Sequence, residues 1–314
     1  MTVPKPRAPM SRWRLYGLSI DAPFPLPGAA PEANMAGSDL TISWSPGVAR
    51  VPEAAAADRT TGASGGPLLW EAPDGASALV WPGEMGLHYA ADGRSLQIVS
   101  RPAKLTYVPT VLVGIGLGWL LQRRGQICLH GTALAWQGRA VGVLGPSGAG
   151  KSTLATALAQ RGAQLLTDDV IVLRGGDGGL MVEPGCTSIR MHPDTAAQRG
   201  LTDVPTQLVP WTNKQLWQPR SELPTEAVRL DRLVLLEPVG AKGPSPTLRP
   251  LSPTMALRQL TQHCYPPQLL HRLHAEHFRR LANVVQQHPV HEVRYAHDWS
   301  HLQKLADLLM PEVG

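Results

Sequence analysis

The stretch that most constrains the fold is residues 145–152, which read Gly-Pro-Ser-Gly-Ala-Gly-Lys-Ser. This stretch fits the phosphate-binding loop pattern G-x-x-x-x-G-K-[ST]. The apolar run at 139–144 before it is typical of a buried strand, and 153–161 after it has apolar residues at helical spacing. A strand, a glycine-rich loop and a helix in this order predict an α/β fold that binds a nucleotide at the start of the helix.

The residue types in the loop suit this chemistry. Glycines let the backbone bend tightly and bring its N–H groups close to phosphate oxygens. Lys151 would supply a cation for the β- and γ-phosphates, and Ser152 a hydroxyl for Mg²⁺. We therefore expect ATP and Mg²⁺ to bind here. The residues expected to contact the nucleotide are Gly145, Pro146, Ser147, Gly148, Ala149, Gly150, Lys151, Ser152 and Thr153.

A pair of carboxylates, Asp168 and Asp169, follows the strand predicted at 164–167. Ligands of α/β sheets bind at the carboxyl ends of strands, so the pair should lie beside the loop. Adjacent side chains on an extended segment point in opposite directions. We expect one aspartate to hold Mg²⁺ together with Ser152, and the other to take the proton from an attacking hydroxyl. The sequence leaves open which does which, and a solvated turn or a helix cap is the alternative.

Two more residues are candidates for the site. His130, followed by Gly131, stands at the expected end of a strand, where an imidazole would hydrogen-bond one of the carboxylates. Arg190 follows a turn and a short strand, and would neutralise a phosphoryl group in transfer. An ordinary strand-end histidine and a surface ion pair are the alternatives for these two residues.

Composition narrows the class of protein. Its 314 residues are 43% hydrophobic, enough for a sizeable core, and the net charge of +5 comes from arginines without a long run. We therefore expect no nucleic-acid partner. The N-terminus has no apolar signal segment, and the apolar stretch 108–121 is short for a membrane span, so we expect a buried helix there and no membrane partner. Three distant cysteines without a CxxC pair fit a cytoplasmic location.

Turn signals divide the chain. Asp74-Gly75 and Asp92-Gly93 separate short apolar runs, which predicts a β-rich N-terminal region over 1–103 that would recognise the substrate or cover the sheet. The catalytic domain would span 104–314 and end in a helical C-terminal tail. The expected strands of the two regions are 13–20, 79–81, 96–99, 126–129, 132–136, 140–144, 164–167, 170–173 and 230–236, and the expected C-terminal helices are 252–283 and 298–309.

Three segments together resemble the catalytic core of HPr kinase/phosphorylase: Cys128-Leu-His-Gly-Thr-Ala-Leu-Ala, the loop itself, and Arg161-Gly-Ala-Gln-Leu-Leu-Thr-Asp-Asp. That family carries a strand-end His-Gly, a G-x-S-G-x-G-K-S loop and an Arg-Gly-x-x-Leu-x-x-Asp-Asp segment at similar spacing. The resemblance implies a P-loop core of the HPr kinase and phosphoenolpyruvate carboxykinase type. It also implies a serine kinase that uses ATP and Mg²⁺, and, because HPr kinases are hexamers, a homo-oligomer.

The chain departs from the family at two points. Val170 follows the aspartate pair where the family has an arginine, and the later Glu-x-Arg-Gly motif is absent. The chain is more similar to divergent HPr-kinase-related proteins, some of which accompany gene clusters for ribosomally made peptides such as lasso peptides. This resemblance implies a Ser of a precursor peptide, or of a small protein, as the acceptor. A small-metabolite kinase and a nucleotide-binding regulatory ATPase are the alternative functions.

Overall fold

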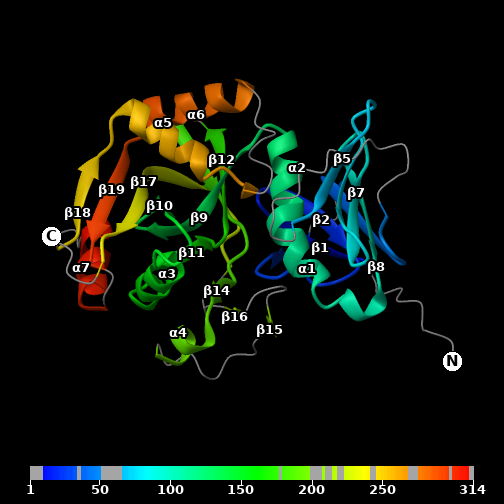
Figure 1. Cartoon of the computed structure of the whole chain (residues 1–314), viewed down its shortest axis with the longest axis horizontal. Coiled ribbons are helices and arrows are strands. Elements are labelled where there is room, and N and C mark those ends of the chain that lie inside the picture. The colour runs from blue at the N-terminus through cyan, green and yellow to red at the C-terminus, as the bar shows by residue number, and fades with distance from the viewer. Residues whose placement is uncertain are drawn as a thin grey trace.

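The computed structural model describes residues 10–33, 37–50, 66–176, 179–198, 207–208, 214–217, 223–240, 245–267, 275–296 and 299–310. These residues form a mixed α/β molecule with two eight-stranded sheets and a small three-stranded sheet. Figure 1 shows the N-terminal sheet on one side, the second large sheet on the other, and the helical segment 108–123 between them.

The N-terminal sheet has the strand order β3-β1-β2-β4-β8-β7-β6-β5. Turns at Asp74-Gly75 and Asp92-Gly93 are confirmed as the links β5–β6 and β7–β8. The single strand expected over 13–20 is wrong, because Tyr16 and Gly17 have φ of 52° and 74° and form a two-residue hairpin turn. The strands are β1 (Ser11–Leu15), β2 (Leu18–Ala22), β3 (Ala30–Pro31), β4 (Leu40–Pro46), β5 (Leu68–Glu71), β6 (Ser77–Trp81), β7 (Met85–Tyr89) and β8 (Ser95–Ser100).

The apolar stretch that follows is helical and buried, as the sequence predicts, but it is not one regular α-helix. A 3-10 turn η1 (Pro102–Lys104) leads into α1 (Val108–Val111), a π turn η2 (Leu112–Gly116) and α2 (Leu117–Arg123). Its apolar side chains share one core with the N-terminal sheet and with residues of the second sheet such as Val170 and Val172. Packing therefore continues across residue 103. Within the described ranges, no helix is both long enough and apolar enough to cross a membrane.

The second large sheet carries the phosphate-loop motif. Its order is β10-β9-β12-β13-β17-β19-β18, with β11 against β9. Strand β17 also pairs with β10, so β10, β9, β12, β13 and β17 form a closed ring of pairings. The strands are β9 (Ile127–Trp136), β10 (Arg139–Leu144), β11 (Gln164–Thr167), β12 (Val170–Gly176), β13 (Gly179–Glu183), β17 (Val228–Pro238), β18 (Thr247–Pro250) and β19 (Val290–Tyr295).

The break expected at His130-Gly131 is wrong, because 127–136 is one continuous strand. Up to His130, β9 pairs with β12, and from Gly131 onward it pairs with β10. A Cβ on Gly131 would lie 2.5 Å from the carbonyl oxygen of Val143. The glycine therefore permits a close approach of two strands and does not end one.

Helices cover both faces of this sheet. α3 (Lys151–Gln160) and α7 (Trp299–Leu309) pack on one face, and α5 (Pro253–Gln262) and α6 (Ala275–Gln287) on the other. The expectation of a helical C-terminal tail misses β19, which lies between α6 and α7, and β18, which directly precedes α5. The small sheet, in the order β14-β16-β15, consists of β14 (Ile189–Met191), β16 (Gln215–Trp217) and β15 (Gln207–Leu208), and the short α4 (Pro193–Gln198) follows β14.

Candidate functional site

The glycine-rich loop runs from the end of β10 to the start of α3. Gly145, Gly148 and Gly150 have φ of 150°, 83° and 84°, values that side chains disfavour. A Cβ on Gly148 would meet no atom within 4 Å, so the outer side of the loop is open. Gly150 is the N-cap of α3, and Lys151, Ser152 and Thr153 form its first turn. The backbone N–H groups at this helix start are suited to bind an anion.

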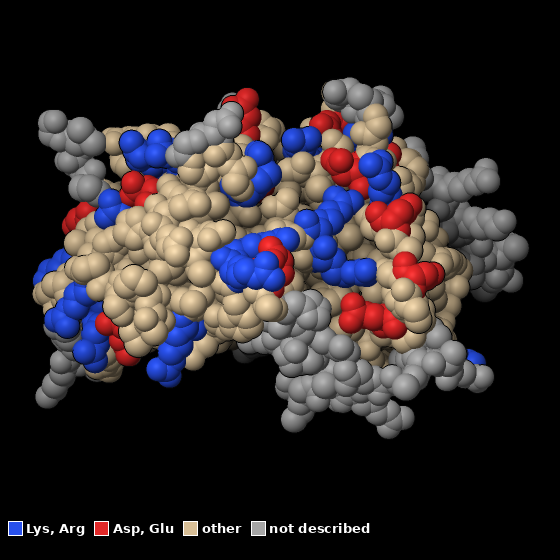
Figure 2. Space-filling model, turned by 90° about the horizontal axis from the view of Figure 1, so that it is seen from above, with Lys and Arg blue, Asp and Glu red and all other residues tan. Residues whose placement is uncertain are grey.

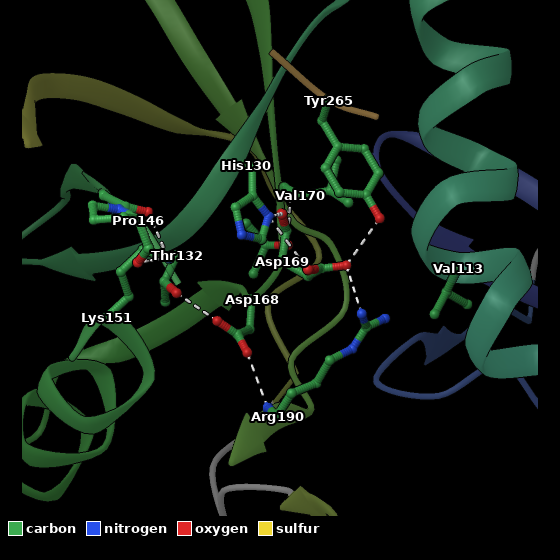
Figure 3. Close-up of polar contacts among 12 residues, drawn as sticks. Val113, His130, Thr132, Pro146, Lys151, Asp168, Asp169, Val170, Arg190 and Tyr265 are labelled. Carbon is green, nitrogen blue, oxygen red and sulfur yellow. Dashed lines mark hydrogen bonds and ion pairs between the residues drawn. The ribbon is translucent and has the colours of Figure 1, made fainter. Parts of the chain in front are cut away.

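Lys151 lies folded over this loop. Its Nζ donates hydrogen bonds to the carbonyl oxygens of Gly145 and Pro146, at 2.7 Å and 3.1 Å. Burial lowers the pKa of Lys151, while the nearby charge of Asp168 raises it and that of Lys214 lowers it further. The ammonium group is thus held against the backbone of the loop, and Figure 3 shows Asp168 as the aspartate on the side of Lys151.

Asp168 is the aspartate on the loop side. Its carboxylate is buried and accepts hydrogen bonds from the Thr132 hydroxyl at Oδ1 and from the Arg190 backbone N–H at Oδ2, the latter at 3.0 Å. Burial raises the pKa of Asp168, and these two hydrogen bonds partly offset that effect. Thr132 lies two residues beyond His130 on β9, so the two side chains share a face of the strand. This spacing was a signal that the sequence reasoning missed.

The side chain of Asp169 points away from that of Asp168, but the cause is not an extended backbone. The φ of Asp169 is +76°, in the left-handed region that Asp tolerates better than most residues. Arg190 Nη1 lies 2.8 Å from Asp169 Oδ2, and the Tyr265 hydroxyl donates to the same oxygen at 3.0 Å. Burial alone would raise the pKa of Asp169, but the charges of Arg190 and His130 and the Tyr265 hydrogen bond lower it overall. Asp169 therefore stays ionised at neutral pH.

His130 lies beside Asp169, in the middle of β9 and not at a strand end. Its Nδ1 is 3.4 Å from Asp169 Oδ1 and 3.1 Å from the backbone oxygen of the same residue. The imidazole also stacks on the Tyr265 ring, with a centroid distance of 5.9 Å. The structure thus brings His130 beside one of the two carboxylates, that of Asp169, while its hydrogen bond is to the backbone oxygen of that residue.

Arg190 connects the two aspartates. Its backbone N–H binds Asp168, and its guanidinium group binds Asp169 and not an open surface. The sequence predicts that Arg190 neutralises a phosphoryl group in transfer; in this structure its guanidinium group holds a carboxylate. Tyr265 was missed altogether, because it lies 96 residues from Asp169 in the chain and only the fold brings them together.

The donor set fits a magnesium–nucleotide complex. Mg²⁺ is commonly bound by one or two carboxylates together with substrate phosphates and water. Each carboxylate oxygen of Asp168 accepts one protein hydrogen bond, which leaves lone pairs for a cation. The described ranges hold no group of three or more His, Cys, Asp or Glu arranged for a metal ion. Asp168 and Ser152 would hold Mg²⁺ together with phosphate oxygens and water.

Comparisons with known proteins give a distant likeness. No protein-family model matches the chain, and no curated protein matches it. Among solved structures, the HPr(Ser) kinase/phosphatase from Coxiella burnetii is similar, at 17% sequence identity and a TM-score of 0.31. The match covers 58% of this chain and 93% of that chain. The relation to this structure is distant, and the candidate site stands on its own geometry.

Proposed function

We propose that the protein is a kinase that uses ATP and Mg²⁺ and transfers the γ-phosphoryl group to a Ser hydroxyl of a peptide or small protein. The observation that supports this most is the divergence of the aspartate pair. Asp168 lies on the side of Lys151 and the glycine-rich loop, and Asp169 lies on the side of His130, Arg190 and Tyr265. Protein kinases use one carboxylate at the metal and another that accepts the proton of the acceptor hydroxyl.

The geometry suggests the role of each residue. The loop amides and Lys151 would bind the phosphates, and Mg²⁺, when bound by Asp168 and Ser152, would neutralise charge on the β- and γ-phosphates. Asp169 would accept the proton of the acceptor hydroxyl. The bond from the acceptor oxygen to the γ-phosphorus then forms, the bond to the β-phosphate oxygen breaks, and ADP leaves. His130 would orient Asp169 from its 3.4 Å contact.

The acceptor is proposed from the sequence resemblance, which favours a ribosomally made precursor peptide. The proposal includes a cytoplasmic enzyme without a nucleic-acid or membrane partner, and a homo-oligomer. Figure 2 shows one face of the molecule, on which Lys and Arg side chains are interspersed with Asp and Glu. Such a mixed surface is typical of a protein that does not bind a polyanion through that face.

A second candidate is a regulatory protein that binds nucleotide and hydrolyses ATP slowly. The observation that favours it is the ion pair of Asp169 with Arg190, because a carboxylate engaged by a guanidinium group is a weaker base. Under the kinase proposal, acceptor binding displaces or shares this contact. Under the second candidate, Asp169 has a structural role, and its replacement leaves ATP hydrolysis unchanged.

The test is phosphate transfer from ATP, followed by mass spectrometry. Purified protein and Mg²⁺ are incubated with HPr and with any precursor peptide encoded beside the gene. We expect one added phosphate on a peptide Ser, and a loss of more than about 100-fold in rate for both Lys151→Ala and Asp169→Asn. Asp307→Asn, which changes an aspartate paired with Arg161 at the surface, is the matched control and should retain the wild-type rate.

Each other outcome has a clear meaning. Transfer to HPr would make the protein a kinase of that carrier. ATP turnover without a labelled peptide would favour a small-metabolite kinase or the regulatory ATPase, which Asp169→Asn would then distinguish. Undiminished transfer in both Lys151→Ala and Asp169→Asn would exclude the proposed roles of these residues.

A further inference from the structure

The π turn Leu112–Gly116 lies directly against the Asp169 cluster. A Cβ at Gly114 would be 3.1 Å from Arg190 Nη2, 3.1 Å from the Tyr265 hydroxyl and 3.3 Å from Asp169 Oδ2. Gly114 also has a ψ of −108°, outside the helical range. The backbone of Gly114 thus packs directly against the Arg190 guanidinium group, the Tyr265 hydroxyl and the Asp169 carboxylate.

The turn leaves one carbonyl without its helical partner. In a regular α-helix, the Leu117 N–H would bind the oxygen of Val113, four residues earlier. Here the Leu117 N–H instead binds the carbonyl oxygens of Leu112, five residues earlier, and of Gly114. The Tyr16 hydroxyl, from the hairpin turn of the N-terminal sheet, donates to Val113 O at 3.1 Å. Tyr16 thus replaces the hydrogen bond that the π turn removes, one residue before Gly114.

Tyr16 also holds the segment that leads to Arg190. Its backbone N–H donates to Pro184 O at 2.6 Å, and its ring lies so close to Gly185 that a Cβ there would be 2.1 Å from it. Further along this segment, the Thr187 hydroxyl donates to Gly28 O of the N-terminal region at 3.1 Å. The N-terminal region therefore contacts both the π turn beside Asp169 and the segment that leads to Arg190.

We propose that Tyr16 and Gly114 are positioning residues, through which the N-terminal sheet fixes the geometry of Asp169 and Arg190. This role goes beyond the two that the sequence suggested for residues 1–103, substrate recognition or cover of the sheet. π turns in helices often occur at functional sites, because a local irregularity aims backbone groups that a regular helix would hide. The proposal rests on the proposed function only where it concerns catalysis.

The first test does not depend on activity. Hydrogen exchange of the Arg190 amide, which binds Asp168 Oδ2, is measured by mass spectrometry on peptides that cover 186–191. We expect exchange to be faster by about tenfold or more in Tyr16→Phe, because the π turn that packs against Arg190 at Gly114 loses its hydrogen bond from the Tyr16 hydroxyl, while the backbone and ring contacts of residue 16 with 184–185 remain. Tyr89→Phe is the matched control, since Tyr89 donates to Gly116 O on the same turn at 2.9 Å, and the atoms nearest a Cβ at Gly116 belong to Leu87, Leu112 and Tyr89 and not to the Asp169 cluster. Equal exchange in Tyr16→Phe and Tyr89→Phe would overturn the proposal.

The second test uses the kinetics of transfer. In Gly114→Ala the added methyl group forces Arg190, Tyr265 or Asp169 to move by a few tenths of an ångström, so we expect kcat to fall by about tenfold with the KM for ATP unchanged. Gly116→Ala is the control, because its Cβ would meet Leu87, Leu112 and Tyr89 and not the site. A fall in kcat that is equal in the two variants would mean a loss of folding and not of position, and would refute the proposal. If the wild type transfers no phosphate, the proposed function fails, and the exchange experiment still decides the positioning role.

Discussion

Replacement of Arg190 by Met would remove the cation from a mostly buried ion pair. The Arg190 and Asp169 side chains are only 20% and 14% exposed, and their closest N–O distance is 2.8 Å. Methionine retains much of the apolar volume of the arginine side chain. The hydrogen bond from the backbone N–H of residue 190 to Asp168 does not depend on the side chain and should persist. The substitution therefore tests the guanidinium group alone.

The expected cost is large because a buried carboxylate loses its charged partner. Breaking a buried pair by removal of one member costs about 3–5 kcal/mol, against about 0–1 kcal/mol for an exposed pair. The Tyr265 hydroxyl and His130 remain near Asp169, so we expect the lower end, about 3 kcal/mol at pH 7. A matched control is Arg161→Met, which breaks a pair of the same 2.8 Å length with side chains 35% and 70% exposed. That variant should lose less than about 1 kcal/mol.

The pH dependence gives a second check. In the wild type the pKa of Asp169 is lowered, so its contribution to stability is present above the unfolded pKa of about 4 and is lost as the pH falls through the folded pKa. Without Arg190, burial dominates and raises the pKa of Asp169. The penalty of the variant is then full at neutral pH and disappears as the pH falls through that raised value. The stability difference between wild type and variant should therefore shrink toward acid.

Urea unfolding followed by tryptophan fluorescence, between pH 4 and pH 8, measures both effects. Equal losses of the free energy of unfolding in Arg190→Met and Arg161→Met at pH 7 would contradict this prediction. A loss of stability in Arg190→Met that grows as the pH falls would also contradict it, because the ionised form of Asp169 would then not be the one that the arginine stabilises.

Three further predictions concern the same site. Thr132→Val removes the hydroxyl that donates a hydrogen bond to Asp168, so the pKa of Asp168 should rise further. The variant should need about tenfold more Mg²⁺ for half-maximal transfer, and an unchanged Mg²⁺ titration would contradict this. Tyr265→Phe removes one charge-assisted hydrogen bond, worth about 1.5–3 kcal/mol, from Asp169. The kcat of Tyr265→Phe should fall at least tenfold with the KM for ATP unchanged. If the double variant Tyr265→Phe, Asp169→Asn loses the same kcat as Asp169→Asn alone, the hydroxyl acts through the carboxylate. Chelation of Mg²⁺ by EDTA should stop transfer without lowering the unfolding midpoint, and transfer that persists in EDTA would exclude a role for the metal.

Local patterns predicted the local parts of this structure. The strand at 139–144, the glycine-rich loop and the helix after it lie where the motif places them, because glycine spacing and apolar periodicity act over a few residues. The position of Asp168 and Asp169 after β11 was predicted for the same reason. Their divergence was also expected, although it comes from the left-handed backbone of Asp169 and not from an extended strand.

Contacts between distant segments were beyond a single sequence. Tyr265 reaches Asp169 across 96 residues, and Tyr16 reaches Val113 across 97. The break expected at His130-Gly131 shows a related limit: a glycine that allows close strand packing cannot be distinguished from one that ends a strand until the partner strand is known. The strand β19 was missed because its six residues lie directly between two helical segments.

The closed ring of strand pairings has a consequence for how the proposed nucleotide site forms. Strand β10 ends at the glycine-rich loop, yet one of its two neighbours is β17, whose residues 230–235 emerge from the ribosome some 90 residues later. The outer strand β19 joins β17 later still. Parallel pairs between such distant segments form slowly, because loop closure must precede the contacts that reward it. A nascent chain that ends before residue 230 thus carries the whole loop motif but lacks the strand that supports it. The proposed ATP affinity should therefore arise late in synthesis and as a single cooperative event.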